Sequence, residues 1–130
     1  MRPVVLLACC LLATACGSTP PDVEPLPESP EPAGATVFSA RPDIVEAHPL
    51  TITSFSRVGD DRLSLHFETG TPECFGVDPT MTETDDVVTV TLMGGTLPEA
   101  QDRMCIMVAV FGTVEVPLQS PLGDRVVTAS

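Results

Sequence analysis

RLSLHFE, residues 62–68, alternates apolar and polar side chains at every position after the arginine. One side of the extended chain carries Leu63, Leu65 and Phe67, and the other carries Ser64, His66 and Glu68. A period of two residues is typical of a β-strand with one face in a core and the other in solvent. We therefore expect a strand at residues 62–68 whose His66 side is exposed.

The same period recurs on both sides of this stretch. Residues 87–93, VVTVTLM, place Val88, Val90 and Leu92 on one face. Further strands are expected at residues 50–55, 77–84, 103–111, 113–116 and 125–128. The run at 103–111, RMCIMVAVF, is the most apolar of them, so we expect a central strand covered on both faces.

Turn residues such as Gly59, Gly70 and Gly94 separate these segments. No stretch shows the 3.6-residue period of a helix, and at most residues 44–48 form a helical turn. Short strands at a spacing of roughly ten residues predict an all-β domain over residues 37–130. We expect a small antiparallel β-sandwich of six or seven strands, with a small barrel as the alternative.

The chain begins with MRPVVLLACCLLATAC, residues 1–16. A short positive start and an apolar run are typical of a secretory signal. The run is too short to cross about 30 Å of hydrocarbon as a helix. The tripeptide ATA directly before Cys16 resembles the lipobox of bacterial lipoproteins, with Ala13 where leucine is usual. The resemblance implies that residues 1–15 are removed as a lipoprotein signal peptide and that Cys16 is lipidated.

A lipid on Cys16 implies an exported protein held on the extracytoplasmic side of a cell membrane. Two or three acyl chains hold a protein firmly, because each buried methylene contributes about 0.8 kcal/mol. The alternative is an ordinary secretory signal that leaves Cys16 as a free thiol. Residues 16–36 are expected to be a disordered tether, since residues 17–35 contain six prolines, four acids and no basic residue.

The 130-residue chain has a formal net charge of −12, with 18 acidic residues against 6 basic ones. Binding to nucleic-acid phosphates relies on lysine and arginine, so the charge argues against a nucleic-acid partner. The same excess of acid argues against electrostatic docking on anionic lipid. We expect membrane contact through the lipid on Cys16 alone, and a monomer.

The five cysteines of the chain fall into three groups. Cys9 and Cys10 leave with the signal, Cys16 takes the lipid, and Cys74 and Cys105 remain. In an oxidising compartment an isolated pair is most simply a disulfide. A metal site is the rival, but these two cysteines and the two histidines lack recognisable ligand spacing. We expect a Cys74–Cys105 disulfide, no metal site and no cofactor.

Motifs that carry catalysis are absent, because the sequence has no nucleophile elbow, no phosphate-binding glycine loop and no HExxH. His66 and Glu68 share a strand face and could act as general base and orienting carboxylate, but a surface pair is the simpler interpretation. Acidic turns at 60–61 and 84–86 leave Ca²⁺ binding open. Arg125 is expected to pair with an acid at the sheet edge. We predict no catalytic residues.

The domain also resembles an uncharacterised group of small exported proteins from high-GC bacteria. The shared features lie within about residues 58–127 and are Cys74-Phe75-Gly76, Glu83-Thr84, Val88-Thr-Val-Thr91, Cys105 and the PLGDR of residues 121–125. The resemblance implies a β-rich module with a disulfide and leaves the activity open.

These observations predict a membrane-anchored, non-enzymatic module that binds a protein or an envelope polymer. The alternatives are a carrier of a small ligand or metal and a small secreted hydrolase. A deep apolar pocket would favour the carrier, and a filled core with a flat face would favour the interaction module. Convergence of His66 with Ser64 and a distant carboxylate would favour the hydrolase.

Overall fold

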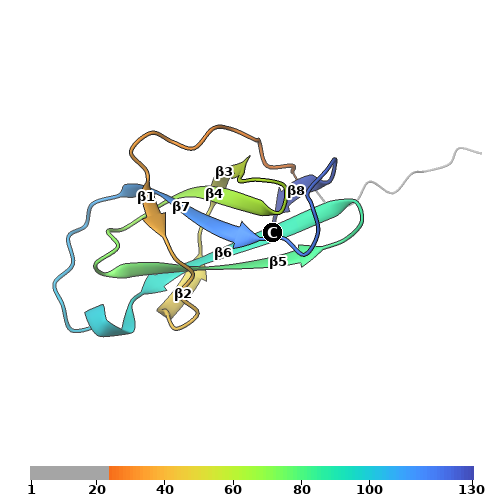
Figure 1. Cartoon of the computed structure of the whole chain (residues 1–130). Coiled ribbons are helices and arrows are strands. Elements are labelled where there is room, and N and C mark those ends of the chain that lie inside the picture. Colours follow the sequence, from red (N-terminus) through yellow and green to blue (C-terminus); the bar gives the residue numbers. More distant parts are fainter. Residues whose placement is uncertain (1–23) are drawn as a thin grey trace, which may run out of the picture.

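The computed structural model describes residues 24–130, and the expected signal and Cys16 lie outside these residues. Two β-sheets pack against each other (Figure 1). The strands are β1 (Thr36–Phe38), β2 (Val45–Pro49), β3 (Ile52–Arg57), β4 (Arg62–Thr69), β5 (Phe75–Glu83), β6 (Val87–Thr96), β7 (Val110–Pro117) and β8 (Val126–Ala129). Within the described residues the one helical element is a 3₁₀ turn, η1 (Pro98–Ala100), and no helix there is long and apolar enough to cross a membrane. The expected all-β sandwich is confirmed.

The first sheet has the order β1-β7-β4-β3, and its longest ladder joins β4 to β7 from Arg62↔Pro117 to Thr69↔Val110. In the second sheet, β6 pairs with β5 along one edge and with β2 and β8 along the other. β8 meets the first residues of β6, and β2 meets its last residues. Two pairings are parallel, β1 with β7 and β6 with β8, so the sheets are mixed where an antiparallel arrangement was expected.

Two segments join the sheets, one at each side of the sandwich. They are residues 24–35, called the N-terminal segment below, and the residues that directly follow β1. On one side the Leu26 N–H donates to a carbonyl of β8, and the Ser29 N–H donates to a carbonyl of β3. On the other side the Arg41 N–H donates to a carbonyl of β5, shortly after β1 has paired with β7. In Figure 1 the N-terminal segment is the orange trace that runs over β3 and β4 to β1. Hydrogen bonds therefore link the sandwich edges that would otherwise be open.

The core between the sheets consists of apolar side chains from both of them. The most deeply buried are Leu63, Leu65, Phe67, Val77, Val88, Val90, Leu92 and Val114. The inward residues predicted from the two-residue period of 62–68 and 87–93 are all in this set. Phe38 of β1 adds a ring whose centre lies 5.4 Å from that of Phe67. Side chains fill the space between the sheets.

The expectation of a central strand at residues 103–111 is wrong. Residues 103–109 form an irregular loop, and β7 begins only at Val110. The neighbours of β7 stop at this point, since the ladder with β4 ends at Thr69↔Val110 and the ladder with β1 ends at Thr36↔Gly112. Apolar sequence favours a strand, but a strand also needs a partner, and the chain supplies none here.

The other strand boundaries differ in detail. The helical turn that the sequence allowed at most at 44–48 does not form, because residues 45–49 form β2 and pair with the end of β6. Residues 24–130 contain eight strands instead of six or seven. β1 and β2 are short and lack a clear two-residue pattern, so the sequence alone did not indicate them.

The folded part starts before residue 37, where the sequence placed its boundary. Leu26 packs against the main core, and backbone hydrogen bonds hold the N-terminal segment to β8 and β3. Prolines are compatible with this role, because an edge segment needs donors at alternate residues only. Pro27 accepts a hydrogen bond from β3 through its carbonyl. The part of the expected tether at residues 16–23 lies outside the described residues.

Candidate functional site

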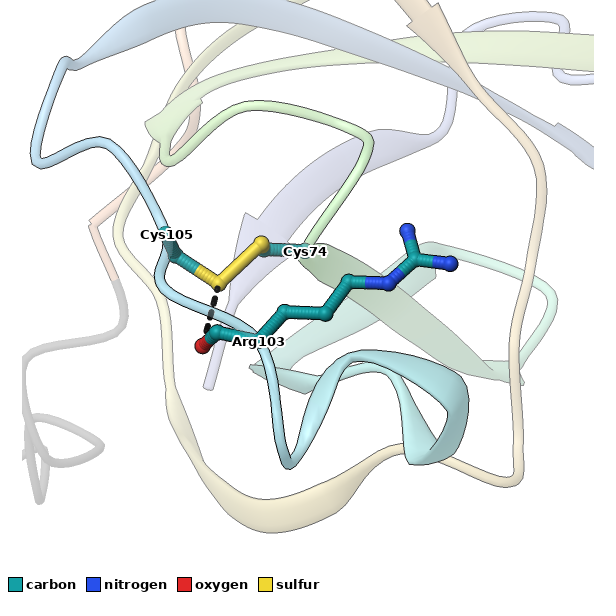
Figure 2. Close-up of a disulfide and its surroundings, with 3 residues drawn as sticks. All are labelled: Cys74, Arg103 and Cys105. Carbon is teal, nitrogen blue, oxygen red and sulfur yellow. Dashed lines mark hydrogen bonds between the residues drawn. A yellow bond between two sulfur atoms is a disulfide. The ribbon is translucent and has the colours of Figure 1, made fainter.

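Cys74 and Cys105 form a disulfide between positions 31 residues apart, with their Cα atoms 6.1 Å from each other (Figure 2). Cys74 lies just before β5, and Cys105 lies in the loop between η1 and β7. The contact drawn in Figure 2 joins the Cys105 sulfur to the Arg103 carbonyl oxygen at 3.7 Å, although a disulfide sulfur carries no hydrogen to donate. The expected disulfide is confirmed, and it attaches this loop to the start of β5.

Residues 104–109, called the apolar loop below, present their side chains to solvent except at Cys105, which is bonded to Cys74. Met104 is fully exposed, Met107 is 90% exposed and Ile106 is 68% exposed. Phe111, at the start of β7, is 64% exposed. Flexible methionine side chains adapt to varied apolar surfaces, and contiguous exposed apolar residues mark interaction sites. The apolar loop is therefore the strongest candidate for a binding surface in the described residues.

A cavity of about 360 Å³ lies between the apolar loop and the ends of the sheets. The loop contributes residues 106–109, and the sheet ends contribute His48, Leu50, Thr69, Gly70 and Phe75. Its walls are mainly apolar, and it lies outside the filled core. This volume is at the lower end of the range for small-ligand pockets, which runs from about 300 to 1,000 Å³. The cavity can accept one or a few apolar side chains or a small apolar molecule.

Arg41 holds the base of the apolar loop in position. Its guanidinium donates to both carboxylate oxygens of Asp43 at 2.8 and 2.9 Å and to those of Glu99 in η1 at 3.1 Å. These hydrogen bonds lower the pKa of the Asp43 and Glu99 carboxyl groups and raise the pKa of Arg41. Arg41 thereby links the connection between β1 and β2 to η1, the turn that precedes the apolar loop.

The surroundings of the apolar loop are mainly acidic. Glu68 lies opposite Phe111 in the β4–β7 ladder, so the two side chains share a face of the sheet. Glu73 precedes the disulfide, and Asp102 precedes the loop, with both residues exposed. Arg103 is a cation in the same region, and its side chain extends away from the disulfide (Figure 2). An acidic border makes this surface complementary to a cationic partner.

The His66 ring, which was expected in solvent, is buried, with only 2% of the residue exposed. The outward face of β4 is covered by the N-terminal segment, which the two-residue period cannot reveal. Ser54 Oγ lies 2.7 Å from His66 Nδ1, and Ser56 Oγ lies 3.1 Å from Nε2. The Ser29 hydroxyl donates to Ser54 Oγ at 2.8 Å. This order of donors makes Nδ1 an acceptor and places the ring proton on Nε2.

Burial lowers the pKa of His66 below its ordinary value, with a smaller opposing effect from the charge of Glu31. The ring is therefore neutral, which fits the hydrogen bonds that it makes. Every buried side-chain nitrogen and oxygen in the described residues has a hydrogen-bond partner. A fully paired, covered ring positions the N-terminal segment on the sheet and has no free nitrogen to offer a substrate.

The serine and carboxylate positions differ from those of a catalytic triad. Ser64 makes no hydrogen bond with His66, and its hydroxyl donates instead to Glu31 Oε1 at 2.7 Å. Glu68 stays exposed at the end of β4. Ser54 and His66 are as close as a nucleophile and base, but the second ring nitrogen meets Ser56 where an orienting carboxylate would be needed.

The acidic turns have structural roles. Backbone carbonyls of Asp60 and Asp61 accept hydrogen bonds from the segment that follows β7. At residues 84–86 the hydroxyl of Thr84 closes the turn by accepting from the Val87 N–H at 3.0 Å. Among the described residues, no three His, Cys, Asp or Glu side chains come together as a metal site would require.

Arg125 pairs with an acid at the sheet edge, as the sequence predicts, and that acid is Glu83 at the end of β5. The two side chains are each 10% exposed, and Arg125 Nη1 lies 3.1 Å from Glu83 Oε1. Arg125 also donates to the carbonyls of Thr84, Ser120 and Pro121. A hydrogen bond from the Gln119 N–H and the contact with Arg125 lower the pKa of Glu83. These contacts hold the segment before β8 on the β5–β6 turn.

The sequence indicated the disulfide but not the candidate binding surface beside it. The same residues were assigned to the core because they are apolar. No sequence signal separated this run from a buried strand, because disulfide cysteines also lie within core strands. Comparison of the chain with protein-family models, with curated proteins and with solved structures found no match.

Proposed function

We propose that this chain is an exported, lipid-anchored binding module without catalytic activity, held to a membrane through Cys16 and contacting a protein partner through the apolar loop. The observation that carries the proposal is the exposure of Met104, Ile106 and Met107 on a strongly acidic protein. Burying such side chains against a partner contributes about 25 cal/mol for each Å² of apolar surface removed from water.

The position of the tether supports a partner that lies away from the anchoring membrane. The N-terminal segment enters the domain beside β8, which pairs with the first residues of β6. The apolar loop lies beyond the other end of this ten-residue strand, about 30 Å away (Figure 1). Residues 17–23, which separate Cys16 from the described part, span at most about 25 Å when extended. An anchor at Cys16 therefore holds the end opposite the loop near the membrane.

The surroundings of His66 favour binding over hydrolysis. Both ring nitrogens are engaged by serines, and the N-terminal segment covers the ring. A general base must reach the proton that it abstracts within hydrogen-bond distance or through one water. Access to His66 requires displacement of a segment that is hydrogen-bonded to both sheets.

The cavity beside the apolar loop favours one further candidate, a carrier of a small apolar molecule. Its volume of about 360 Å³ and its apolar walls are compatible with such a ligand. The two candidates are separated by native mass spectrometry of the protein purified from its own cells. A carrier retains a bound molecule as a defined mass increment, whereas the proposed interaction module has the mass of residues 16–130 with the lipid.

Anchoring is tested by cell fractionation of a Cys16→Ser variant. We expect this variant to leave the membrane fraction, because only the lipid holds the domain there. Cys10→Ser, at another cysteine of the same stretch, is the matched control and is expected to remain in the membrane fraction. Retention of Cys16→Ser in the membrane fraction contradicts the lipid anchor.

Binding is tested by placing a photo-crosslinking amino acid at Met107 in intact cells. We expect discrete crosslinked adducts from this position. The matched control position is Asp85, an exposed residue of the β5–β6 turn at the opposite end of the sandwich. Equal adducts from both positions, or none from Met107, contradict a binding role for the apolar loop.

A further inference from the structure

The backbone of the apolar loop is unpaired. No N–H or C=O group of residues 104–108 makes a hydrogen bond with another backbone group in the described structure. The loop leads directly into β7, whose ladders end at Val110 on the β4 side and at Gly112 on the β1 side. An unpaired segment that continues a sheet strand is a template for the addition of another strand.

The side chains of this segment suit strand pairing. Residues 104–112 contain no proline and no charged residue, and valine and isoleucine favour extended chain. The cavity lies beside residues 106–109. Alternate side chains of an added strand point to the same face, so one of them can enter the cavity while the backbone pairs with the loop.

Charge decides which occupant fits. Three exposed acids, Glu68, Glu73 and Asp102, lie near the loop against one cation, Arg103. The chain as a whole carries a net charge of −12. A second copy of this chain would bring one acidic border against another, and an anionic lipid surface would meet the same repulsion. A polypeptide segment with lysine or arginine at its ends has the complementary charge.

We propose that residues 104–109 accept an extended, apolar polypeptide segment with basic residues at its ends, which adds to the protein as a β-strand and places one side chain in the cavity. This inference rests on the proposed binding function and specifies the chemistry of the partner. The backbone provides affinity for extended chain, the cavity selects an apolar side chain, and the acidic border selects cationic flanks.

The test uses the full chain as its Cys16→Ser variant and a fluorescent synthetic peptide, KKVTVTVKK. We expect saturable binding by fluorescence anisotropy that weakens as salt is added, because the charged flanks contribute. A peptide with proline at its centre, KKVTPTVKK, lacks a backbone donor for the ladder. Its affinity should be at least about tenfold lower than that of KKVTVTVKK. EEVTVTVEE should not bind. Equal binding of the three peptides, or binding of none, overturns the proposal.

Variants of the loop locate the binding. Val108→Pro removes a backbone donor from a position that makes no backbone hydrogen bond in the described structure, so the fold is retained while peptide binding falls about tenfold. Val108→Ala keeps the N–H and shortens a side chain that lines the cavity, so its loss of binding should be clearly smaller than that of Val108→Pro. Met107→Asp provides a second variant at an exposed site and should also lose binding. Equal loss with Val108→Ala and Val108→Pro contradicts backbone pairing.

Hydrogen exchange gives an independent readout of strand addition. The amides of residues 106–108 should exchange more slowly when KKVTVTVKK is bound. Binding of the parent chain to phosphatidylglycerol vesicles without binding of the peptide, or dimerisation that Met107→Asp abolishes, assigns the surface to another occupant and overturns the proposal. If Met107 gives crosslinks in cells but the purified protein does not bind the peptide, this inference is overturned and the proposed binding function is retained.

Discussion

Ser54 Oγ lies 2.7 Å from His66 Nδ1, and this contact ties β3 to β4 beneath the N-terminal segment. Ser29 of that segment donates to the same hydroxyl. Ser54 and Ser56 each contact one ring nitrogen, and the N-terminal segment covers the ring. The ring is therefore buried and fully hydrogen-bonded. The cluster fixes the first described residues to the sandwich, so its loss should be visible in stability.

Ser54→Ala removes the hydroxyl that both Ser29 and His66 contact. We expect the free energy of unfolding to fall by about 1–3 kcal/mol, because a buried ring nitrogen is left without a partner. Urea unfolding of the full chain measures the change. Ser39→Ala, at an exposed serine, is the matched control and should differ by less than about 0.5 kcal/mol. A comparable effect from both variants would contradict a structural role for the cluster.

Stability should depend on pH through His66. Burial lowers its pKa in the folded state below the ordinary 6.5, so between these values the unfolded state binds more protons than the folded state. The free energy of unfolding is therefore fully retained above about pH 6.5 and decreases as the pH falls below that value. Urea unfolding at a series of pH values measures the slope.

The His66→Gln variant isolates this contribution. A glutamine amide can accept from one serine and donate to the other, but it does not titrate. We expect a flatter pH dependence just below pH 6.5 than in the parent chain. His48→Gln replaces an exposed ring and is the control, with the parent slope expected. An unchanged slope in His66→Gln would contradict this assignment, because it would mean that His66 binds protons equally in the folded and unfolded states.

Removal of the disulfide should lower stability and release the apolar loop. In the chain-entropy model, a bridge between positions 31 residues apart contributes about 3.5–4 kcal/mol. Cys74→Ala combined with Cys105→Ala should therefore reduce the free energy of unfolding by about that amount, as measured in urea. Limited proteolysis should cut residues 103–109 faster in this variant. Reduction of the parent chain by dithiothreitol is the control and should produce the same two effects.

Arg125→Met tests the buried ion pair at the sheet edge. Removing one partner of such a pair leaves an uncompensated charge and typically costs about 3–5 kcal/mol. Arg62→Met is the matched control, because its pair with Glu115 is about half exposed and should contribute at most about 1 kcal/mol. Thermal unfolding of both variants gives the comparison. Equal losses would contradict the difference in burial.

Amide hydrogen exchange tests where the folded part begins. The Leu26 and Ser29 N–H groups donate to carbonyls of β8 and β3, so we expect both to be protected. Glu24 makes no such backbone bond and is the internal control, with fast exchange expected. Fast exchange at all three positions would support the tether that the sequence predicted for this region.

The two-residue period predicted the core well, because the faces of β4 and β6 that carry Leu65 and Val90 are set by local alternation. It failed at His66, because burial of the opposite face depends on a segment more than thirty residues away in sequence. It also failed at Met107, because apolar character indicates what a side chain prefers and does not supply a neighbouring strand. The proline-rich sequence predicted a disordered tether as far as residue 36, but the part around Leu26 pairs with the sandwich. An edge segment needs few backbone N–H donors, so prolines do not prevent this pairing.

The candidate binding surface at residues 104–109 was missed for the same reason, because local sequence does not show which strands will be neighbours. Cys105 was predicted to be bonded to Cys74, and the structure agrees. The sequence could not show that the cysteine holds Ile106 and Met107 outside the sheet. That arrangement depends on where the ladders of β7 end, which is a property of the assembled fold.

The pairing of the N-terminal segment with β8 has a consequence for the order of assembly. A chain synthesised from its N-terminus presents Leu26 long before its partner strand, residues 126–129, has been made. Until the last residues arrive, the segment can pair only with β3, and the Leu26 N–H has no partner on the second sheet. Closure of this edge is therefore a long-range step, and a product that ends before residue 126 keeps an unpaired edge at which a protease can cut.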